Sequence, residues 1–132
     1  MWLSEKAVAR AAAGAGARVG SVTIGGKSAA VLLTGECRNL SVLSPQGVSW
    51  RPGAGTQVLV VETDDGEKFI AGAVDGGGSF DSLREGEVCL RGGDGWLKLD
   101  ADGAIRIKGN VYITGRLFLN GKEVTVQEEA AL

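Results

Sequence analysis

The sequence contains no histidine, and this absence excludes several kinds of site at once. Histidine is the most common general base, the usual partner of serine and cysteine nucleophiles, and the most common zinc ligand. The sequence also lacks a P-loop or a dinucleotide-binding fingerprint placed after a strand. It therefore predicts no catalytic residues, no metal ligands and no cofactor, and the protein is expected not to be an enzyme.

The carboxylates do not supply an alternative site. Adjacent pairs occur at Asp64–Asp65 and Glu128–Glu129, but neighbours on a turn or a tail point apart, and nothing desolvates them enough to separate their pKa values. The segment Asp100-Ala101-Asp102-Gly103 begins like a calcium loop, yet the later ligands and the closing glutamate are absent. All three segments are predicted to be solvated turns or tail.

Aromatic residues are also scarce, at 5% of the chain, and the net charge is only −2 with both signs interspersed. A barrel that binds single-stranded nucleic acid stacks bases on several aromatic side chains in a basic groove. Between residues 18 and 75 the aromatic residues are Trp50 and Phe69 alone. Nucleic acid is therefore not an expected partner.

No segment approaches the ~20 consecutive apolar residues of a transmembrane helix. Residues 1–17 are rich in alanine, but Glu5, Lys6 and Arg10 interrupt them, which is unlike the apolar core of a signal peptide. We expect a short arm or helix here, and a soluble protein made in the cytoplasm. The two cysteines, Cys37 and Cys89, are expected to act as small apolar residues, although their redox state stays open.

Glycine is abundant, with 22 copies, and its clustering at the ends of alternating runs predicts an all-β chain with many tight turns. Five strands are expected within residues 18–75, at 19–24, 29–34, 37–43, 57–63 and 68–74. Five strands with a long loop before the last pair predict a small Greek-key barrel of the oligonucleotide/oligosaccharide-binding (OB) type. A small sandwich is the alternative.

Trp50 lies in the long loop of this predicted barrel, next to Arg51-Pro52. It is expected either to plug the mouth of the barrel or to anchor a contact with another protein. A glycine-rich linker is predicted at residues 76–85, an alternating ribbon at 86–126 and a polar tail at 127–132.

The ribbon contains eight aliphatic residues at odd-numbered positions. They are Leu97, Leu99, Ile105, Ile107, Val111, Ile113, Leu117 and Leu119. Because strand side chains alternate between faces, an even spacing between strands can keep all eight on one face. These eight residues are the predicted core of an assembly.

Two chain paths compete for this ribbon. An antiparallel meander with two-residue turns at Lys108–Gly109 and Thr114–Gly115 would mix apolar and charged residues on both faces, since residues that flank such a turn pair. A chain that winds in one direction about an axis keeps all eight aliphatic residues inside, so this path is favoured. Val124 and Val126 are even-numbered, which predicts a one-residue change of register at Asn120–Gly121.

A thin winding ribbon cannot bury a core by itself, and both of its edges carry unpaired backbone N–H and C=O groups. Other chains must cover the apolar face and pair these edges. Three copies around a threefold axis would do both.

The order of these parts resembles the central spikes of contractile phage tails. The similarity lies in VGSVTI at 19–24, PGAGTQVLVVETDDGEKFIAGAV at 52–74 and GEVCLRGGDGWLKLDADGAIRIKGNVYITGRLFLNGKEV at 86–124. These segments are similar to the baseplate assembly protein V family, which is related to the Mu- and P2-like phage tail spikes and to type VI secretion spikes. The resemblance implies an OB-type barrel at 18–75 followed by an intertwined trimeric triple-stranded β-helix at 86–126.

The same resemblance implies the partners and the location. The homotrimer would sit in the baseplate of a virion tail, with its barrels on a tail hub protein and its needle directed at the target cell envelope. Several members of the family bind iron at the apex through histidines, which this chain lacks, so a separate tip protein at the C-terminal end is expected. The alternative function is a binding module, either a receptor- or glycan-binding fibre or a nucleic-acid-binding barrel.

Overall fold

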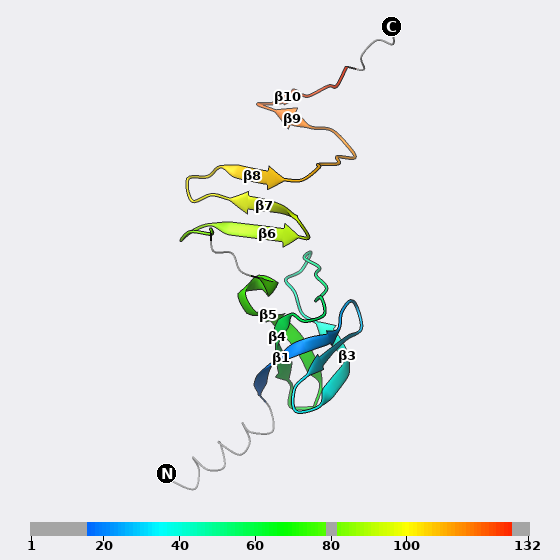
Figure 1. Cartoon of the computed structure of the whole chain (residues 1–132). Coiled ribbons are helices and arrows are strands. Elements are labelled where there is room, and N and C mark those ends of the chain that lie inside the picture. The colour runs from blue at the N-terminus through cyan, green and yellow to red at the C-terminus, as the bar shows by residue number, and fades with distance from the viewer. Residues whose placement is uncertain (1–15, 79–81, 128–132) are drawn as a thin grey trace. The chain divides into compact units, whose positions relative to one another are not determined.

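The structure, a computed structural model, describes residues 16–78 and 82–127. The chain divides into two compact units, Met1–Asp81 and Ser82–Leu132 (Figure 1). The described residues form β-strands and loops, with one short 3₁₀ turn, η1 (Val74–Gly77). Most of the predicted N-terminal arm and of the polar tail lies outside the described residues.

The first unit is a closed five-stranded barrel. Its strands are β1 (Ala17–Ile24), β2 (Ala29–Leu32), β3 (Glu36–Val42), β4 (Gln57–Glu62) and β5 (Lys68–Ala73). They close in the order β1-β2-β3-β5-β4, and β3 and β5 are parallel whereas all other neighbours are antiparallel. The predicted five-stranded barrel is confirmed, and a sandwich is not formed.

The barrel is built around a small aliphatic core. On β4, Val58 and Val60 are buried, whereas Leu59 and Val61 are only partly covered, as expected for side chains that alternate between the two faces of a strand. The buried core cluster consists of Val22, Ala29, Val31, Leu40, Val58, Val60 and Ile70. Burial of these side chains gives the first unit an interior within a single chain.

The close crossing of β1 and β2 requires glycine at position 20. A Cβ atom placed on Gly20 would lie 2.5 Å from the carbonyl oxygen of Leu32 and 2.7 Å from Val31 Cγ1. Real Cβ atoms do not approach a carbonyl oxygen so closely, so the two strands would have to separate. Gly72 on β5 has open space around the same position.

The second unit contains five further strands. A three-stranded antiparallel sheet is formed by β6 (Val88–Gly92), β7 (Gly95–Leu99) and β8 (Ile105–Lys108), in that order. A short hairpin follows, formed by β9 (Phe118–Leu119) and β10 (Lys122–Glu123). Arg116 and Glu123 form an exposed ion pair at this hairpin, with 3.7 Å between Nε and Oε1.

Specific turns determine the pairing in this unit. The β6–β7 turn is the two-residue Gly93–Asp94, in which Gly93 has φ of 57°. The β9–β10 turn has φ of 49° at Asn120 and 79° at Gly121, as a type I′ hairpin turn requires. Between β7 and β8 lies a longer loop, closed by a 2.8 Å hydrogen bond from Asp100 N to the Ala104 carbonyl oxygen.

The prediction of a chain that winds in one direction is wrong for residues 88–108, which form an antiparallel meander. The physical reason is that the chain reverses at Gly93–Asp94 and at the loop 100–104, not at the turns that the sequence analysis considered. The longer loop pairs Leu97 with Ile107 and Leu99 with Ile105, so the odd-numbered residues still share a face.

The alternating ribbon predicted at 86–126 is not continuous strand. Residues 109–117 belong to no strand, because no neighbouring strand is aligned with them in the described part of the chain. The register change predicted at Asn120–Gly121 has a simple origin. A two-residue hairpin turn pairs odd with even positions, and Val124 N donates to the Leu117 carbonyl oxygen at 2.7 Å.

Substitution of Gly20 tests the close crossing of β1 and β2. Gly20→Ala is expected to lower the free energy of unfolding of the barrel by about 1–3 kcal/mol, the usual cost of overpacking. Gly72→Ala is the matched control, since it adds the same methyl group to a barrel strand with open space. The measurement is denaturant unfolding followed by circular dichroism, and equal losses in the two variants would contradict the crossing.

Candidate functional site

The sheet β6–β8 of the second unit is amphipathic. Residues directly opposite each other on neighbouring strands share a face. One face therefore carries two apolar rows across the three strands, which are Val88–Leu99–Ile105 and Leu90–Leu97–Ile107. This set of six side chains is here called the apolar face.

The apolar face is not covered by the described residues of the second unit. Among the described residues 82–127 none is buried. Ile105 is 63% exposed and Ile107 is 54% exposed, values that are unusual for isoleucines that share one face of a sheet. The described part of the second unit therefore has no interior of its own, in contrast to the barrel.

The eight predicted core residues fall into three groups in the structure. Leu97, Leu99, Ile105 and Ile107 come together on the apolar face. Leu117 and Leu119 lie on or next to β9, and Val111 and Ile113 lie in the segment 109–117. Leu97 is half-buried and the other seven are exposed, so the single chain does not gather the eight into one core.

Three apolar residues outside the eight predicted core residues lie opposite members of that set. Val88 and Leu90 belong to the apolar face, and Val124 lies opposite Leu117. All three have even numbers, because each follows or precedes a two-residue turn that pairs odd with even positions. The register change predicted at Asn120–Gly121 accounts for Val124, and the dipeptide Gly93–Asp94 is the signal that could have identified Val88 and Leu90.

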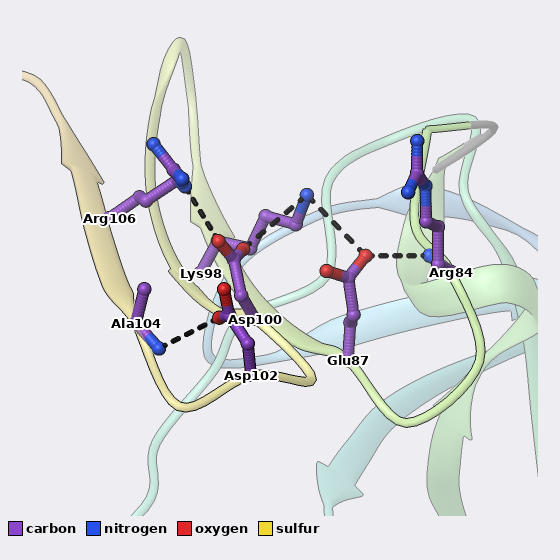
Figure 2. A network of polar contacts seen from close by, with 7 residues as sticks. All are labelled: Arg84, Glu87, Lys98, Asp100, Asp102, Ala104 and Arg106. Carbon is purple, nitrogen blue, oxygen red and sulfur yellow. Dashed lines mark hydrogen bonds and ion pairs between the residues drawn. The ribbon is translucent and has the colours of Figure 1, made fainter.

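The opposite face of the sheet carries an ion-pair network at the end nearest the β7–β8 loop (Figure 2). Lys98 and Arg106 are directly paired across β7 and β8. Arg106 Nε lies 2.6 Å from Asp100 Oδ2, and Lys98 Nζ lies 3.7 Å from Asp100 Oδ1 and 3.5 Å from Glu87 Oε1. Two carboxylates thus offset the repulsion between two cations on adjacent strands.

The geometry of Asp100 explains its acidity. The hydrogen bond from Arg106, and then the charges of Arg106 and Lys98, lower the pKa of the Asp100 carboxyl, although partial desolvation opposes this shift. The same contact raises the pKa of Arg106. The network therefore holds β7 and β8 together most strongly when Asp100 is ionised.

Asp64, Asp65 and Asp102 lie in turns, and Glu128 and Glu129 lie outside the described residues. Ala104 N donates to Asp102 Oδ1 at 3.1 Å, and Gly103 N donates to the Asp100 carbonyl oxygen at 3.0 Å, so the predicted turn at 100–103 is confirmed. Asp65 accepts hydrogen bonds from Thr63 Oγ1 and Glu67 N, which lower its pKa. No group of three or more side chains suited to a metal ion occurs within residues 16–78 and 82–127.

Trp50 and the cysteines occupy structural positions in the described chain. Trp50 packs against the barrel core, and its Nε1 donates to the Leu43 carbonyl oxygen at 3.0 Å, which ties the long loop to the end of β3. Cys37 on β3 and Cys89 on β6 are both half-buried free thiols. Lys68 Nζ lies 3.9 Å from Cys37 Sγ.

In the described ranges, no helix has the length and apolarity needed to cross a bilayer. Comparison of the chain with models of protein families, with curated proteins and with solved structures finds no match.

The acidity of Asp100 gives a pH-dependent prediction. Because its folded pKa lies below the unfolded value of 3.8, its contribution to stability is present above that value and is lost as the pH falls through the folded pKa. Asp100→Asn is therefore expected to lower the Tm of the second unit at pH 7, and the difference from the parent should shrink on acidification.

The measurement is differential scanning calorimetry at neutral and acid pH. Asp64→Asn is the matched control, because Asp64 is an exposed turn aspartate of the other unit. A Tm difference between Asp100→Asn and the parent that stays constant down to the lowest pH would contradict this role of the carboxylate.

Proposed function

We propose that this chain is a structural, non-enzymatic protein, the central spike of the baseplate of a contractile phage tail or a phage-tail-like particle. It acts as a homotrimer in which three second units wrap around one axis as an intertwined triple-stranded β-helix. The observation that carries the proposal is the second unit, which exposes its aliphatic side chains and has no buried residue in its described part.

The free energy of burial is of the size needed to support this association. Full burial of one aliphatic side chain contributes about 1.5–3 kcal/mol. The eight predicted core residues are roughly half exposed, so covering them contributes on the order of 8 kcal/mol per chain by the same measure. This is comparable with the cost of about 4–15 kcal/mol for immobilising a partner, and the added residues Val88, Leu90 and Val124 favour assembly further.

The backbone also supports exchange between copies. The sheet β6–β8 has two outer edges, and the segment 109–117 has no strand partner in the described chain. Such edges pair readily with other strands. Val111 and Ile113 lie in this segment, so pairing of the segment with neighbouring copies would bring them to the same axis as the apolar face.

The first unit has the role of attachment in this proposal. Its strand order and its parallel β3–β5 pair are compatible with an OB-type barrel that docks on a tail hub protein. The turn between β4 and β5 carries Asp64, Asp65 and Glu67, an acidic group that disfavours nucleic acid as the ligand of the barrel. Because the chain lacks histidine, a separate tip protein completes the C-terminal end.

The proposed mechanical function, transmission of force along the shaft, follows from the closure of the three chains into a prism. A prism of three chains in which every backbone group is paired has no free edge and resists bending. When the tail sheath contracts, such a shaft transmits force along its axis to the target cell envelope.

Mass measurement in native conditions tests the assembly. The parent chain is expected to be a trimer at micromolar concentration, whereas the double variant Ile107→Asp/Ile113→Asp is expected to be monomeric, because six carboxylates would meet in a dry interior. Tyr112→Asp is the matched control. Tyr112 is 90% exposed and lies outside the predicted core, so this variant is expected to remain trimeric.

A monomeric parent chain would contradict the trimer, and so would a trimeric double variant. The location in the tail requires a separate test. Antibodies against the chain are expected to label the baseplate end of contractile particles from the source cells, and labelling at any other position would overturn the spike assignment.

A further inference from the structure

We propose that one end of the barrel binds a small carboxylate that carries an apolar group. Arg18 and Lys68 would receive the carboxylate, and Leu33 and Val60 would contact the apolar group. These four residues line a cavity of about 380 Å³ in the first unit, here called the end cavity, which falls within the range of about 300–1,000 Å³ typical of small-molecule sites. The inference goes beyond the proposed function, which rests on the second unit.

The two ends of the barrel are closed in different ways. At the end where β3 stops, the loop 44–55 is held on two sides. Trp50 in this loop packs against the core and donates to the Leu43 carbonyl oxygen, and Gly26 N donates to the Pro52 carbonyl oxygen at 2.9 Å. At the opposite end, where β1, β3 and β5 begin, the strands are joined by the short turns 33–35 and 63–67. The end cavity lies at this second end.

Charged side chains face the interior at this second end. Arg18 on β1 lies directly opposite the buried Val60 on β4. Glu62 follows Val60 by two residues on the same strand, and Lys68 on β5 lies directly opposite Glu62. Because directly opposite residues share a face and strand side chains alternate, all three charged side chains are on the core side of the barrel wall. All three line the end cavity.

The charges in the end cavity are not balanced by the described residues. Arg18, Glu62 and Lys68 take part in none of the ion pairs formed within residues 16–78 and 82–127. Lys68 is half-buried, and its Nζ contacts Cys37 Sγ at 3.9 Å, which is not a carboxylate. Two cations and one carboxylate leave the lining with one positive charge in excess. A single carboxylate from a ligand would balance this charge.

The floor of the end cavity is apolar. Val60 is 3% exposed and belongs to the core cluster, and Leu33 packs against this cluster. An apolar group next to the carboxylate of the ligand would cover this surface and gain the free energy of burial. Inorganic phosphate fits less well, because its second negative charge would lie close to Glu62 and the apolar floor would stay uncovered.

A carboxylate with an adjacent apolar group has two sources. One is a free small molecule, such as an acylated apolar amino acid. The other is the last residue of a peptide chain, when its side chain is apolar. Arginine and lysine receive the carboxylate in the same way in both cases, so the recognition chemistry is shared and the length of the ligand distinguishes the sources.

Titration of N-acetylleucine into the full chain, followed by proton–nitrogen correlation NMR, tests the inference. The backbone signals of Val60, Glu62 and Lys68 are expected to shift on binding. N-acetylleucinamide, which has the same side chain but no charge, is expected to bind about tenfold more weakly, since one charge-assisted hydrogen bond is lost. Equal affinity for the two compounds, or no shift at millimolar concentration, would overturn the proposal.

Arg18→Gln and Lys68→Gln are each expected to weaken the binding of N-acetylleucine about tenfold, for the same reason. The matched control is Lys27→Gln/Arg51→Gln, which removes two exposed cations of the same unit that do not line the end cavity and is expected to bind as the parent does. Parent-like binding by both Arg18→Gln and Lys68→Gln contradicts the site, and so does an equal loss in the control. Arg18 is exposed, so Arg18→Gln gives the same test if Lys68→Gln does not fold.

Two further probes distinguish the sources of the ligand and its charge. The tripeptide N-acetyl-glycyl-seryl-leucine has a free carboxylate on an apolar last residue. Binding of the tripeptide about tenfold tighter than that of N-acetylleucine assigns the end cavity to chain termini, and equal affinity assigns it to small molecules. Tighter binding of inorganic phosphate than of N-acetylleucine would overturn the proposal.

The end cavity and the spike are tested separately. The cavity lies within one barrel, so the double variant Ile107→Asp/Ile113→Asp is expected to bind N-acetylleucine as the parent does. A monomeric parent that binds through Arg18 and Lys68 would refute the spike and leave the carboxylate site standing. A trimeric parent that does not bind N-acetylleucine would do the reverse.

Discussion

The hydrophobic effect acts differently on the two halves of this chain, and most of the molecule's properties depend on that difference. In the barrel, Val58, Val60 and Ile70 are removed from water by the closure of five strands. In the second unit, an equally regular alternation yields an open three-stranded sheet with a solvent-exposed aliphatic face. Because non-polar surface of this kind is costly to leave in water, the second unit has a strong tendency to find a covering surface.

The polar face decides which side of the sheet is covered. Lys98 and Arg106 lie on neighbouring strands and are held by Glu87 and Asp100, so burial of this side would desolvate four charged groups. Burial of the opposite side desolvates aliphatic groups only. In the proposed trimer, this difference between the two sides determines which side of the sheet is the inner one.

The barrel was predictable because residues close together in the sequence mark each of its strands. Each of its five strands lies within two residues of the predicted range, since alternation and glycine-ended turns mark strands directly. The path of the second unit was not predictable in the same way. Alternation reports which residues share a face, and it does not report whether the next strand returns or continues around an axis.

The candidate site also contains residues that local spacing predicts and residues whose place depends on the chain path. The four odd-numbered residues on β7 and β8 were identified correctly as one face, because their spacing alone places them there. Val88 and Leu90 were missed, since their membership depends on the turn at Gly93–Asp94. The contact between Asp100 and Arg106 likewise depends on the pairing of β7 with β8, which no local pattern encodes.

Because turn length sets which face of the sheet each strand residue occupies, it also limits how the sequence of this region can change. A substitution inside the loop 100–104 does not change which residues of β7 and β8 share a face. Insertion of one residue there, unless a longer loop or a bulge absorbed it, would turn Ile105 and Ile107 to the polar face and Arg106 to the apolar face. Natural variants of this region should therefore differ freely in the composition of this loop but tolerate length changes mainly in steps of two.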